Sequence, residues 1–251
     1  MKTRLDNLRR IHGDSIVSYA NTIRLNMELA ELLRGVFLYE DLKKKIVEVM
    51  RYMEEKGLNY GRSGNASIRV KEGYVLITPS EVVKSKMAPE DILVVTMDGD
   101  VVEGDRTPTV EMPLHLAIYK SYKHVGAIIH AHALYTSVLA AAREPLPPIT
   151  EEMAIYTGGE VRVADYAPFG SEELAKNAVK ALENRSAVIL ANHGVVACGR
   201  NIDEALEVLT VVERCAQIYV LAKLLGRVYS LPEEVVEFQK KLFLRKLMKP
   251  G

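Results

Sequence analysis

Hydrophobic residues recur at helical spacing near both ends of the chain. Residues 15–34 carry apolar side chains every three or four positions and are followed by Gly35, where a helix commonly ends. Residues 39–56 repeat this pattern and also stop at a glycine. Two further amphipathic segments, residues 203–225 and 232–249, lie near the carboxyl end. The pattern therefore predicts helices at both ends of the chain.

The middle of the chain has a different pattern, which predicts short strands. Residues 66–70 and 74–78 are strand-like and flank a turn, and residues 91–97 and 101–104 form a second pair around Gly99. Further along, helical and strand-like stretches alternate. These predicted helices cover residues 110–122, 134–143 and 171–184, and the strands cover residues 126–132, 160–165, 186–192 and 195–199. The order predicts a sheet sandwiched by helices, of the α/β or α+β class.

The length of 251 residues favours one main core over two full domains. A hydrophobic content of 48% with 26% charged residues is ordinary for a globular protein. We find no low-complexity linker and no internal repeat. The division we predict is a helical N-terminal extension over residues 1–38 and a single domain over residues 39–251.

The charge balance and the cysteine content limit which partners and which cellular compartment are expected. Lys and Arg together number 33 and so do Asp and Glu, so no net field attracts polyanions, and nucleic acid is not expected as a partner. Cys198 and Cys215 are too few for a disulfide scaffold and do not form a CxxC pair. The sequence has no apolar run of signal-peptide or membrane-spanning length. A cytoplasmic protein without a membrane partner is the expectation.

The predicted strand in AIIHAHALYT carries His130 and His132 two positions apart. Side chains at i and i+2 of a strand point to the same face, roughly 7 Å apart, so the two imidazoles could converge on one metal ion. A zinc site in an enzyme takes three protein ligands and leaves one position open. Two packed, hydrogen-bonded histidines remain the alternative for this pair considered alone.

His193 and Glu111 are the candidates that could complete such a site. His193 lies in ILANHGVVACG between two apolar strands, where we expect Gly194 to let the backbone reverse. Taken alone it could be an ordinary turn histidine. Glu111 lies where a loop enters a predicted helix, a position that also suits a surface carboxylate facing the helix dipole. Near a metal on three histidines, Glu111 would be a natural general base.

The other histidines and one glycine-rich stretch are weaker candidates. His115 follows Glu111 by four residues, so it could orient a site group or be a packed core histidine. His12 and His124 are expected at the solvated surface. The stretch GRSGNASIR could bind a phosphate or carboxylate through backbone N–H groups, or it could be a plain turn before a strand.

Five motifs in the same order, GNASIR, ITPS, PTVEMPLH, IIHAH and ANHGVVACG, resemble the class II aldolase/adducin family over about residues 40–229. That family includes fuculose-1-phosphate aldolase and ribulose-5-phosphate 4-epimerase. The resemblance implies a three-layer α/β fold, with a mainly antiparallel central sheet flanked by helices. It also implies a site for Zn²⁺ or another divalent cation, and a homotetramer with active sites at subunit contacts.

Carried over by position, the resemblance implies a role for seven residues. The implied metal ligands are His130, His132 and His193, the catalytic carboxylate is Glu111, and the phosphate-binding residues are Asn65, Ser80 and Thr109.

The sequence departs from the family pattern around the implied phosphate site. Glu81 stands where the aldolases usually have glycine, and Val110 stands where serine is frequent. Lys84 or Lys86 could supply compensating charge. A substrate with a carboxylate, or without a phosphate, therefore stays open.

The proton donor to the aldehyde also differs. Glu151 and Glu152 occupy the region where fuculose-phosphate aldolase has an acid/base tyrosine that reaches into the neighbouring subunit's site.

The activity implied by the resemblance is reversible cleavage of a ketose 1-phosphate, such as a fuculose-1-phosphate-like sugar, into dihydroxyacetone phosphate and an aldehyde, with Glu111 as general base. A dehydratase resembling methylthioribulose-1-phosphate dehydratase is the alternative that shares the same site residues. The sugar-phosphate 4-epimerases carry Asp in place of Glu111, and the noncatalytic adducin-like members lack the histidines. Both of these readings are therefore less favoured.

Overall fold

The short apolar runs between turns assemble into one sheet. The computed structural model describes residues 39–70 and 73–247, and within them the sheet has eight strands in the order β4-β3-β2-β1-β5-β8-β7-β6. The strands are β1 Asn65–Arg69, β2 Tyr74–Ile77, β3 Leu93–Thr96, β4 Val101–Glu103, β5 Ala127–Ala131, β6 Val163–Ala164, β7 Ala187–Leu190 and β8 Gly194–Gly199. All neighbours pair antiparallel except β6 and β7, which pair parallel. This confirms the expected α/β fold with a mainly antiparallel central sheet.

Helices form where the sequence has helical periodicity, together with one that it did not predict. A first helix covers residues 39–55, and the later helices are α2 Met112–Ser121, α3 Leu134–Ala142, α4 Glu151–Thr157, α5 Glu172–Leu182, α6 Ile202–Leu224 and α7 Glu233–Leu247. Two 3-10 turns, η2 Lys84–Lys86 and η3 Pro89–Asp91, lie between β2 and β3. The unpredicted helix α4 is short, and the Thr150 hydroxyl caps it by accepting a hydrogen bond from the Met153 N–H.

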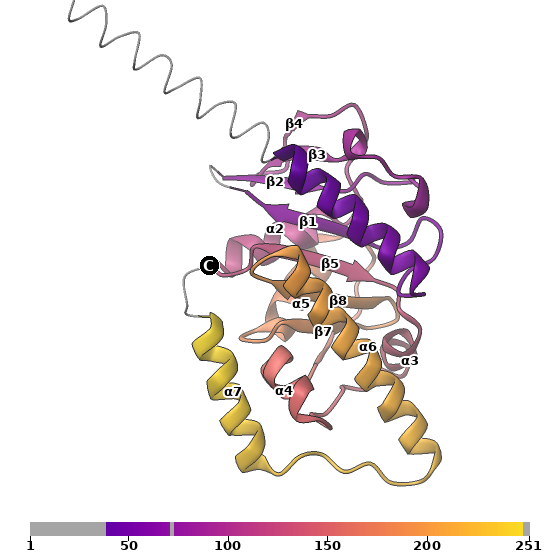
Figure 1. Ribbon diagram of the computed structural model, residues 1–251, viewed down its shortest axis with the longest axis vertical. Helices are drawn as coiled ribbons and strands as arrows, with labels where there is room; N and C mark the ends of the chain where they lie inside the picture. The colour runs from indigo at the N-terminus through magenta and orange to yellow at the C-terminus, as the bar shows by residue number, and fades with distance from the viewer. Residues whose placement is uncertain (1–38, 71–72, 248–251) are drawn as a thin grey trace, which may run out of the picture. The chain divides into compact units, whose positions relative to one another are not determined.

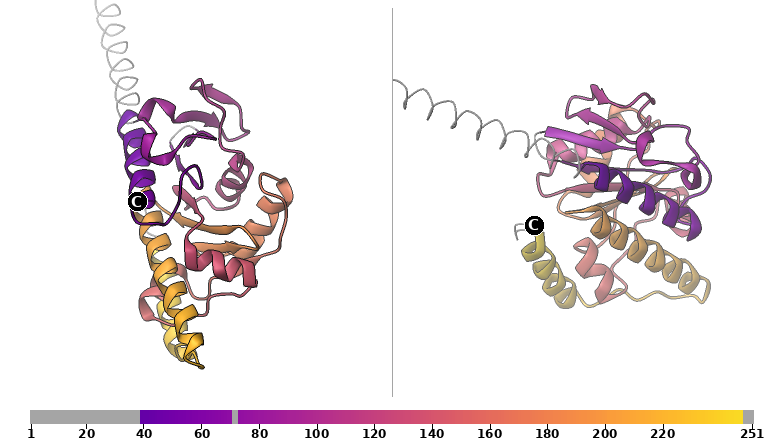
Figure 2. Two further views of the ribbon diagram at one scale, coloured as in Figure 1. Left: turned by 90° about the vertical axis from the view of Figure 1, so that its right-hand side faces the viewer. Right: turned by 45° about the horizontal axis from the view of Figure 1, so that its top comes forward.

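Helices cover both faces of the sheet (Figures 1 and 2). Helices α2 and α5 pack together on one face, and α6 lies along β5 and β8 on the other, with α3 and α4 beside it and α7 against α4. Helical segments on both sides of a sheet complete the three layers expected from the sequence.

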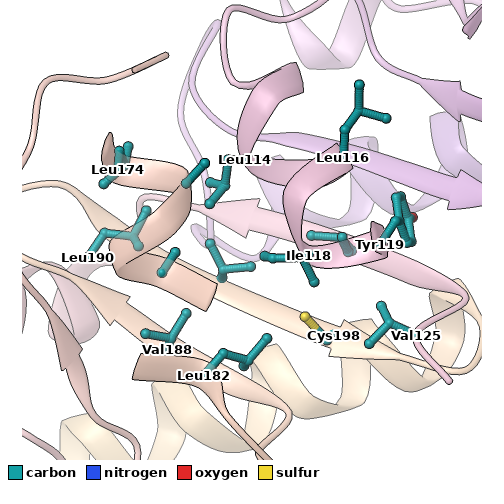
Figure 3. Close-up of a cluster of buried hydrophobic side chains, with 14 of the residues drawn as sticks. Leu114, Leu116, Ile118, Tyr119, Val125, Leu174, Leu182, Val188, Leu190 and Cys198 are labelled. Atoms are coloured by element: carbon teal, nitrogen blue, oxygen red, sulfur yellow. The ribbon is translucent and has the colours of Figure 1, made fainter. Parts of the chain in front are cut away.

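The main hydrophobic cluster lies between the α2/α5 layer and the sheet. Leu114 and Ile118 of α2 and Leu174 of α5 meet Val188 and Cys198 from the strands (Figure 3). Each fully buried aliphatic side chain of this kind contributes roughly 1.5–3 kcal/mol. The cluster holds α2 against the sheet and thereby fixes the position of Glu111, the residue at the amino end of α2.

Strand alternation decides which side chains of β5 face this layer. Ile128 belongs to the cluster under α2, and His130, two residues on, shares its face. His130 pairs with Asn65 of β1 on one side and Val196 of β8 on the other. The imidazole is therefore held in the middle of the sheet.

Two predictions concern residues that the structure does not describe. The helix predicted over residues 15–34 and the extension over residues 1–38 lie outside the described residues, so both stay predictions.

Within the described residues, none of the helices combines the length and the apolar character needed to cross a lipid bilayer.

Candidate metal centre and active site

Strand β5 and the hairpin between β7 and β8 bring three histidines together. His130 is the penultimate residue of β5, His132 follows the strand end, and His193 immediately precedes β8. The ring centroid of His130 lies 4.8 Å from that of His132 and 4.7 Å from that of His193. The centroids of His132 and His193 are 5.1 Å apart. One ring nitrogen from each lies within 4.8 Å of the others, a group that could hold a metal ion. The three predicted histidines do converge.

Gly194 acts in a way that differs from our prediction. The left-handed residue of the hairpin is Asn192, with φ of 56°, so Asn192 rather than Gly194 reverses the chain. A Cβ atom on Gly194 would lie 2.4 Å from the carbonyl oxygen of Ala131 and 3.2 Å from ring atoms of both His130 and His132. The glycine is needed because the rings and the neighbouring strand leave no space for a side chain.

Substituting Gly194 by alanine should therefore disturb the histidine cluster. We expect Gly194→Ala to lose most of its bound metal, because the added methyl group must push the two rings or the strand aside. Metal content per chain, measured by atomic emission after dialysis, checks this. Gly57→Ala is the control for a general loss of stability, since its φ of +69° strains an added Cβ that meets no other atom within 4 Å; metal content at the wild-type level in both variants would contradict the prediction.

The hydrogen bonding of His130 determines which of its nitrogens faces the centre. His130 Nδ1 lies 3.1 Å from the carbonyl oxygen of Val195, which can only accept, so Nδ1 carries the proton. In the neutral ring the Nε2 lone pair is then bare. It lies 2.9 Å from His132 Nε2 and 3.0 Å from Glu111 Oε2. His132 Nε2 could donate an N–H to His130 Nε2, but the Glu111 carboxylate carries no proton to donate. These three atoms therefore include more hydrogen-bond acceptors than donors.

Glu111 lies across from the histidines at the amino end of α2. The residue is 4% exposed, and its Oε2 accepts a hydrogen bond of 3.0 Å from Asn65 Nδ2. Its Oε1 has no hydrogen-bond partner among the described residues and lies 3.2 Å from His193 Nε2. Burial favours a higher pKa for Glu111, but His130, His193 and Asn65 outweigh this and hold the pKa below its usual value. The carboxylate is therefore ionised.

The two less buried histidines are neutral. Burial is the main cause that lowers the pKa of His132 to about 3 and the pKa of His193 to about 4. Neutral imidazoles have lone pairs ready for a metal, and an orphaned carboxylate oxygen lies beside them. These residues fit a divalent cation, which would compete with a proton for the same atoms.

A cavity of about 470 Å³ opens beside this cluster and reaches the residues predicted to bind phosphate. Asn65, Ser80 and Thr109 all line it, together with Glu111 and His193. Six of the seven predicted site residues therefore line one pocket, and the seventh, His130, is buried against His132 and Glu111.

Of the two lysines considered for added charge, only Lys84 faces this pocket. Lys84 lines the cavity and is 1% exposed, whereas Lys86 is exposed and does not line it. Burial, opposed in part by Glu54, lowers the pKa of Lys84 to about 8. Glu81 also lines the pocket and has φ of 58°, the left-handed conformation that favours glycine. Glu81 therefore adopts the left-handed backbone conformation that favours glycine, the residue that the aldolases usually have at this position.

Sequence reasoning missed one residue that supports the site. Asn59 Oδ1 accepts a hydrogen bond of 2.9 Å from the backbone N–H of His132 and so fixes the end of β5. Its amide packs against Gly64, where a Cβ atom would lie 2.0 Å from Asn59 Nδ2 and φ is +73°. Asn59 lies in a loop without periodicity, so no sequence pattern pointed to it.

Glu151 and Glu152 are not among the residues that line this pocket. Both belong to the first turn of α4 and are exposed, and Glu151 Oε2 accepts a hydrogen bond of 2.8 Å from Gln239 of α7. Neither carboxylate therefore reaches the histidine cluster within this chain.

The fold and the histidine cluster together define the class of protein. The family model described as Class II Aldolase and Adducin N-terminal domain matches residues 44–220. The chain belongs to the class II aldolase and adducin family. Class II aldolases depend on a divalent metal ion, which agrees with the ring nitrogens gathered here.

Several members of the family are close to this chain. It is 37% identical over 207 residues to the 5-deoxy-D-ribulose 1-phosphate aldolase of Bacillus thuringiensis serovar kurstaki, covering 82% of this chain and 97% of the relative. It is 34% identical over 196 residues to the 5-methylthioribulose-1-phosphate/5-deoxyribulose-1-phosphate aldolase of Rhodospirillum rubrum, covering 78% and 88%. A solved structure of an L-fuculose 1-phosphate aldolase superimposes with a TM-score of 0.78 at 41% identity, covering 81% of this chain and 96% of that chain.

Proposed function

We propose that this protein is a divalent-metal-dependent aldolase that reversibly cleaves a ketose 1-phosphate into dihydroxyacetone phosphate and an aldehyde. The observation that supports it most is the convergence of three imidazoles and an orphaned carboxylate oxygen at the floor of one pocket. The names of the relatives favour this reaction class, since all three reported above are sugar-phosphate aldolases.

The metal ligands in this proposal are His130, His132 and His193, and zinc is the ion that three neutral histidines suit best. When bound, the cation supplies a Lewis acid that polarises the ketone oxygen of the substrate. His130 is held for this role by its hydrogen bond to Val195, which keeps Nε2 directed at the centre.

Glu111 is the proposed group that exchanges a proton with substrate carbon. In the synthetic direction its carboxylate removes a proton from the hydroxymethyl carbon of dihydroxyacetone phosphate. In the cleavage direction the bond between C3 and C4 breaks, C3 receives that proton back, and the C4 hydroxyl loses its own proton as the aldehyde forms. The protons balance, because one is gained at C3 for the one lost at C4.

The phosphate end of the substrate is proposed to bind Asn65, Ser80 and Thr109, and Lys84 and Arg62 line the same pocket as positive charges. Asn65 uses one of its two amide hydrogens for Glu111, so the other remains for a phosphate oxygen. Glu81 at the same pocket opposes an anion, and the ammonium of Lys84 offsets this charge. A phosphorylated sugar is therefore compatible with Glu81 in place of the usual glycine.

A panel of ketose 1-phosphates tests the proposed function. The sugars to compare are 5-deoxyribulose 1-phosphate, 5-methylthioribulose 1-phosphate and fuculose 1-phosphate, following the names of the relatives. We expect release of dihydroxyacetone phosphate and an aldehyde from at least one of them. Loss of water without carbon–carbon cleavage would indicate the dehydratase, and inversion at C4 would indicate the epimerase. No reaction with any sugar, at full metal content, would contradict the proposal.

The buried lysine of the pocket makes a second test necessary, because some aldolases act through a lysine Schiff base. We expect that borohydride added with substrate leaves the activity intact, since the polarisation of the ketone needs no covalent bond to Lys84. Residual activity and the intact mass of the protein are the measurements. A mass increase that disappears in Lys84→Met would overturn the metal-dependent mechanism.

The assembly and the compartment are also proposed. We infer a cytoplasmic homotetramer, as the family resemblance implies. Tyr60, Leu134 and Phe169 are 69%, 64% and 70% exposed, so each is an apolar side chain available for contact between subunits. Light scattering coupled to gel filtration tests this, and a monomeric mass would contradict it.

A further inference from the structure

A row of buried polar side chains connects Glu111 to the far end of α2. Asn65 Nδ2 lies 3.0 Å from Glu111 Oε2, and His115 Nε2 lies 2.6 Å from Asn65 Oδ1. Ser67 Oγ lies 2.7 Å from His115 Nδ1 and 2.8 Å from the Tyr119 hydroxyl. None of the five side chains contacts bulk water appreciably, since each residue is at most 5% exposed.

Simple periodicity places these residues in one row. Glu111, His115 and Tyr119 follow one another at intervals of four and lie on one face of α2 and its amino end. Asn65 and Ser67 alternate on β1 and share the face that meets this helix. Tyr119 closes the row, and its ring lies 4.7 Å beneath the Arg69 guanidinium. Two elements therefore interlock through hydrogen bonds rather than through apolar contact alone.

The chemistry of the groups determines the direction of each hydrogen bond. The Asn65 amide turns its NH₂ toward Glu111 Oε2, which accepts, and its oxygen toward His115. That oxygen also only accepts, so His115 must carry its proton on Nε2.

The rest of the row follows from this proton. Burial lowers the pKa of His115 to about 3, so the ring is neutral and its Nδ1 is bare. The Ser67 hydroxyl then donates to Nδ1 and accepts from Tyr119. Every donor in the row points toward Glu111.

We propose that His115 is a positioning residue for Glu111: its Nε2–H holds the Asn65 amide in the orientation that donates to Oε2, so that Oε1 is the oxygen that exchanges the proton with substrate carbon. This rests on the proposed aldolase function for the proton transfer, but not for the hydrogen bonds themselves. The orphaned state of Oε1 agrees with it, because Oε2 is engaged and Oε1 is not.

Loss of the His115 N–H should leave Asn65 Oδ1 without its buried donor, so the amide loses one of its two anchors and holds Glu111 Oε2 less firmly. A mispositioned catalytic group loses rate without losing substrate binding. We expect His115→Leu to lower kcat roughly 10–100-fold, as losses of supporting hydrogen bonds commonly do, with KM nearly unchanged. His115→Gln offers an amide N–H near the position of Nε2 and should recover most of that loss.

Two controls separate positioning from a general loss of stability. Tyr122→Phe removes a hydrogen bond of 2.9 Å from Tyr122 to the carbonyl of Val179, next to the same helix and away from the row. It should lower the melting temperature and leave kcat unchanged. Metal content, measured in every variant, should stay at the wild-type level. Wild-type kcat in His115→Leu, or an equal loss in His115→Gln, would overturn the proposal.

Neutron diffraction tests the hydrogen-bond direction without any substrate. We expect a deuterium on His115 Nε2 and none on Nδ1; the opposite tautomer would overturn the proposal whatever the reaction is. Should His115→Leu not fold, His115→Asn keeps a polar side chain that is too short to donate to Asn65 Oδ1 from the position of Nε2, and it should lower kcat. An unchanged kcat in His115→Asn would overturn the proposal. Failure of the wild type on every ketose 1-phosphate would instead count against the proposed function.

Discussion

Glu111→Gln should lower kcat by roughly 10²–10⁴-fold, the usual contribution of a general base, while metal content stays at the wild-type level. The amide has nearly the shape of the carboxylate and can still accept a hydrogen bond from Asn65 Nδ2, so the packing at the amino end of α2 is preserved. It cannot take a proton from carbon. The loss should therefore appear in kcat rather than in KM.

The measurement for Glu111→Gln is steady-state cleavage of the best ketose 1-phosphate, together with metal content per chain. Glu90→Gln is a suitable control, because Glu90 is exposed and lies in the η3 turn away from the pocket. Wild-type kcat in Glu111→Gln would remove this carboxylate from the mechanism. Loss of the metal in the same variant would show that Glu111 is a ligand rather than a base.

His130→Ala should abolish both metal retention and turnover. His130 is completely buried at the centre of the sheet, and its Nε2 faces both His132 and Glu111. Without it only two imidazoles remain, and the orphaned oxygen of Glu111 has no cation to face. Two histidines are fewer ligands than catalytic zinc sites in proteins use.

A folding defect must be separated from a loss of ligand in His130→Ala, because the truncation leaves a cavity in the core. His193→Ala serves this purpose, since the His193 side chain is 16% exposed and its removal leaves a smaller gap. His124→Ala is the control for an imidazole outside the cluster. Both cluster variants should lose metal and activity, whereas His124→Ala should keep both. Full metal content in His193→Ala would contradict the three-histidine site.

The sequence predicted the sheet and most helices because their signals are local. His130 and His132 illustrate this, since alternation in an apolar strand is enough to put them on one face. The joining of His193 to that pair depends on β8 lying beside β5, which is a long-range pairing. The sequence indicates this pairing only through the place of His193 between two apolar strands and the order of the motifs. Helix α4 was not predicted because its seven residues are too few to show a clear helical periodicity.

Other features could not be read from the sequence because they depend on close packing. The role of Gly194 comes from the rings and the carbonyl that surround it, not from its backbone angles. Likewise, Asn59 accepts a hydrogen bond from the backbone N–H of His132. A backbone donor is present at almost every residue, so the sequence carries no signal for this contact. The sequence does not decide between an orienting role and a core position for His115, because its hydrogen-bond partners Ser67 and Asn65 lie on a distant strand.

The central claim is that His130, His132 and His193 hold a divalent cation beside Glu111. Anomalous X-ray diffraction from crystals of the metal-loaded protein, recorded on both sides of the absorption edge of the metal, tests it most directly. We expect one strong peak within coordination distance of a ring nitrogen of all three histidines, and we expect it to be lost in His130→Ala. A featureless map at this position with the three rings in place, or a peak bound elsewhere on the chain, would contradict it.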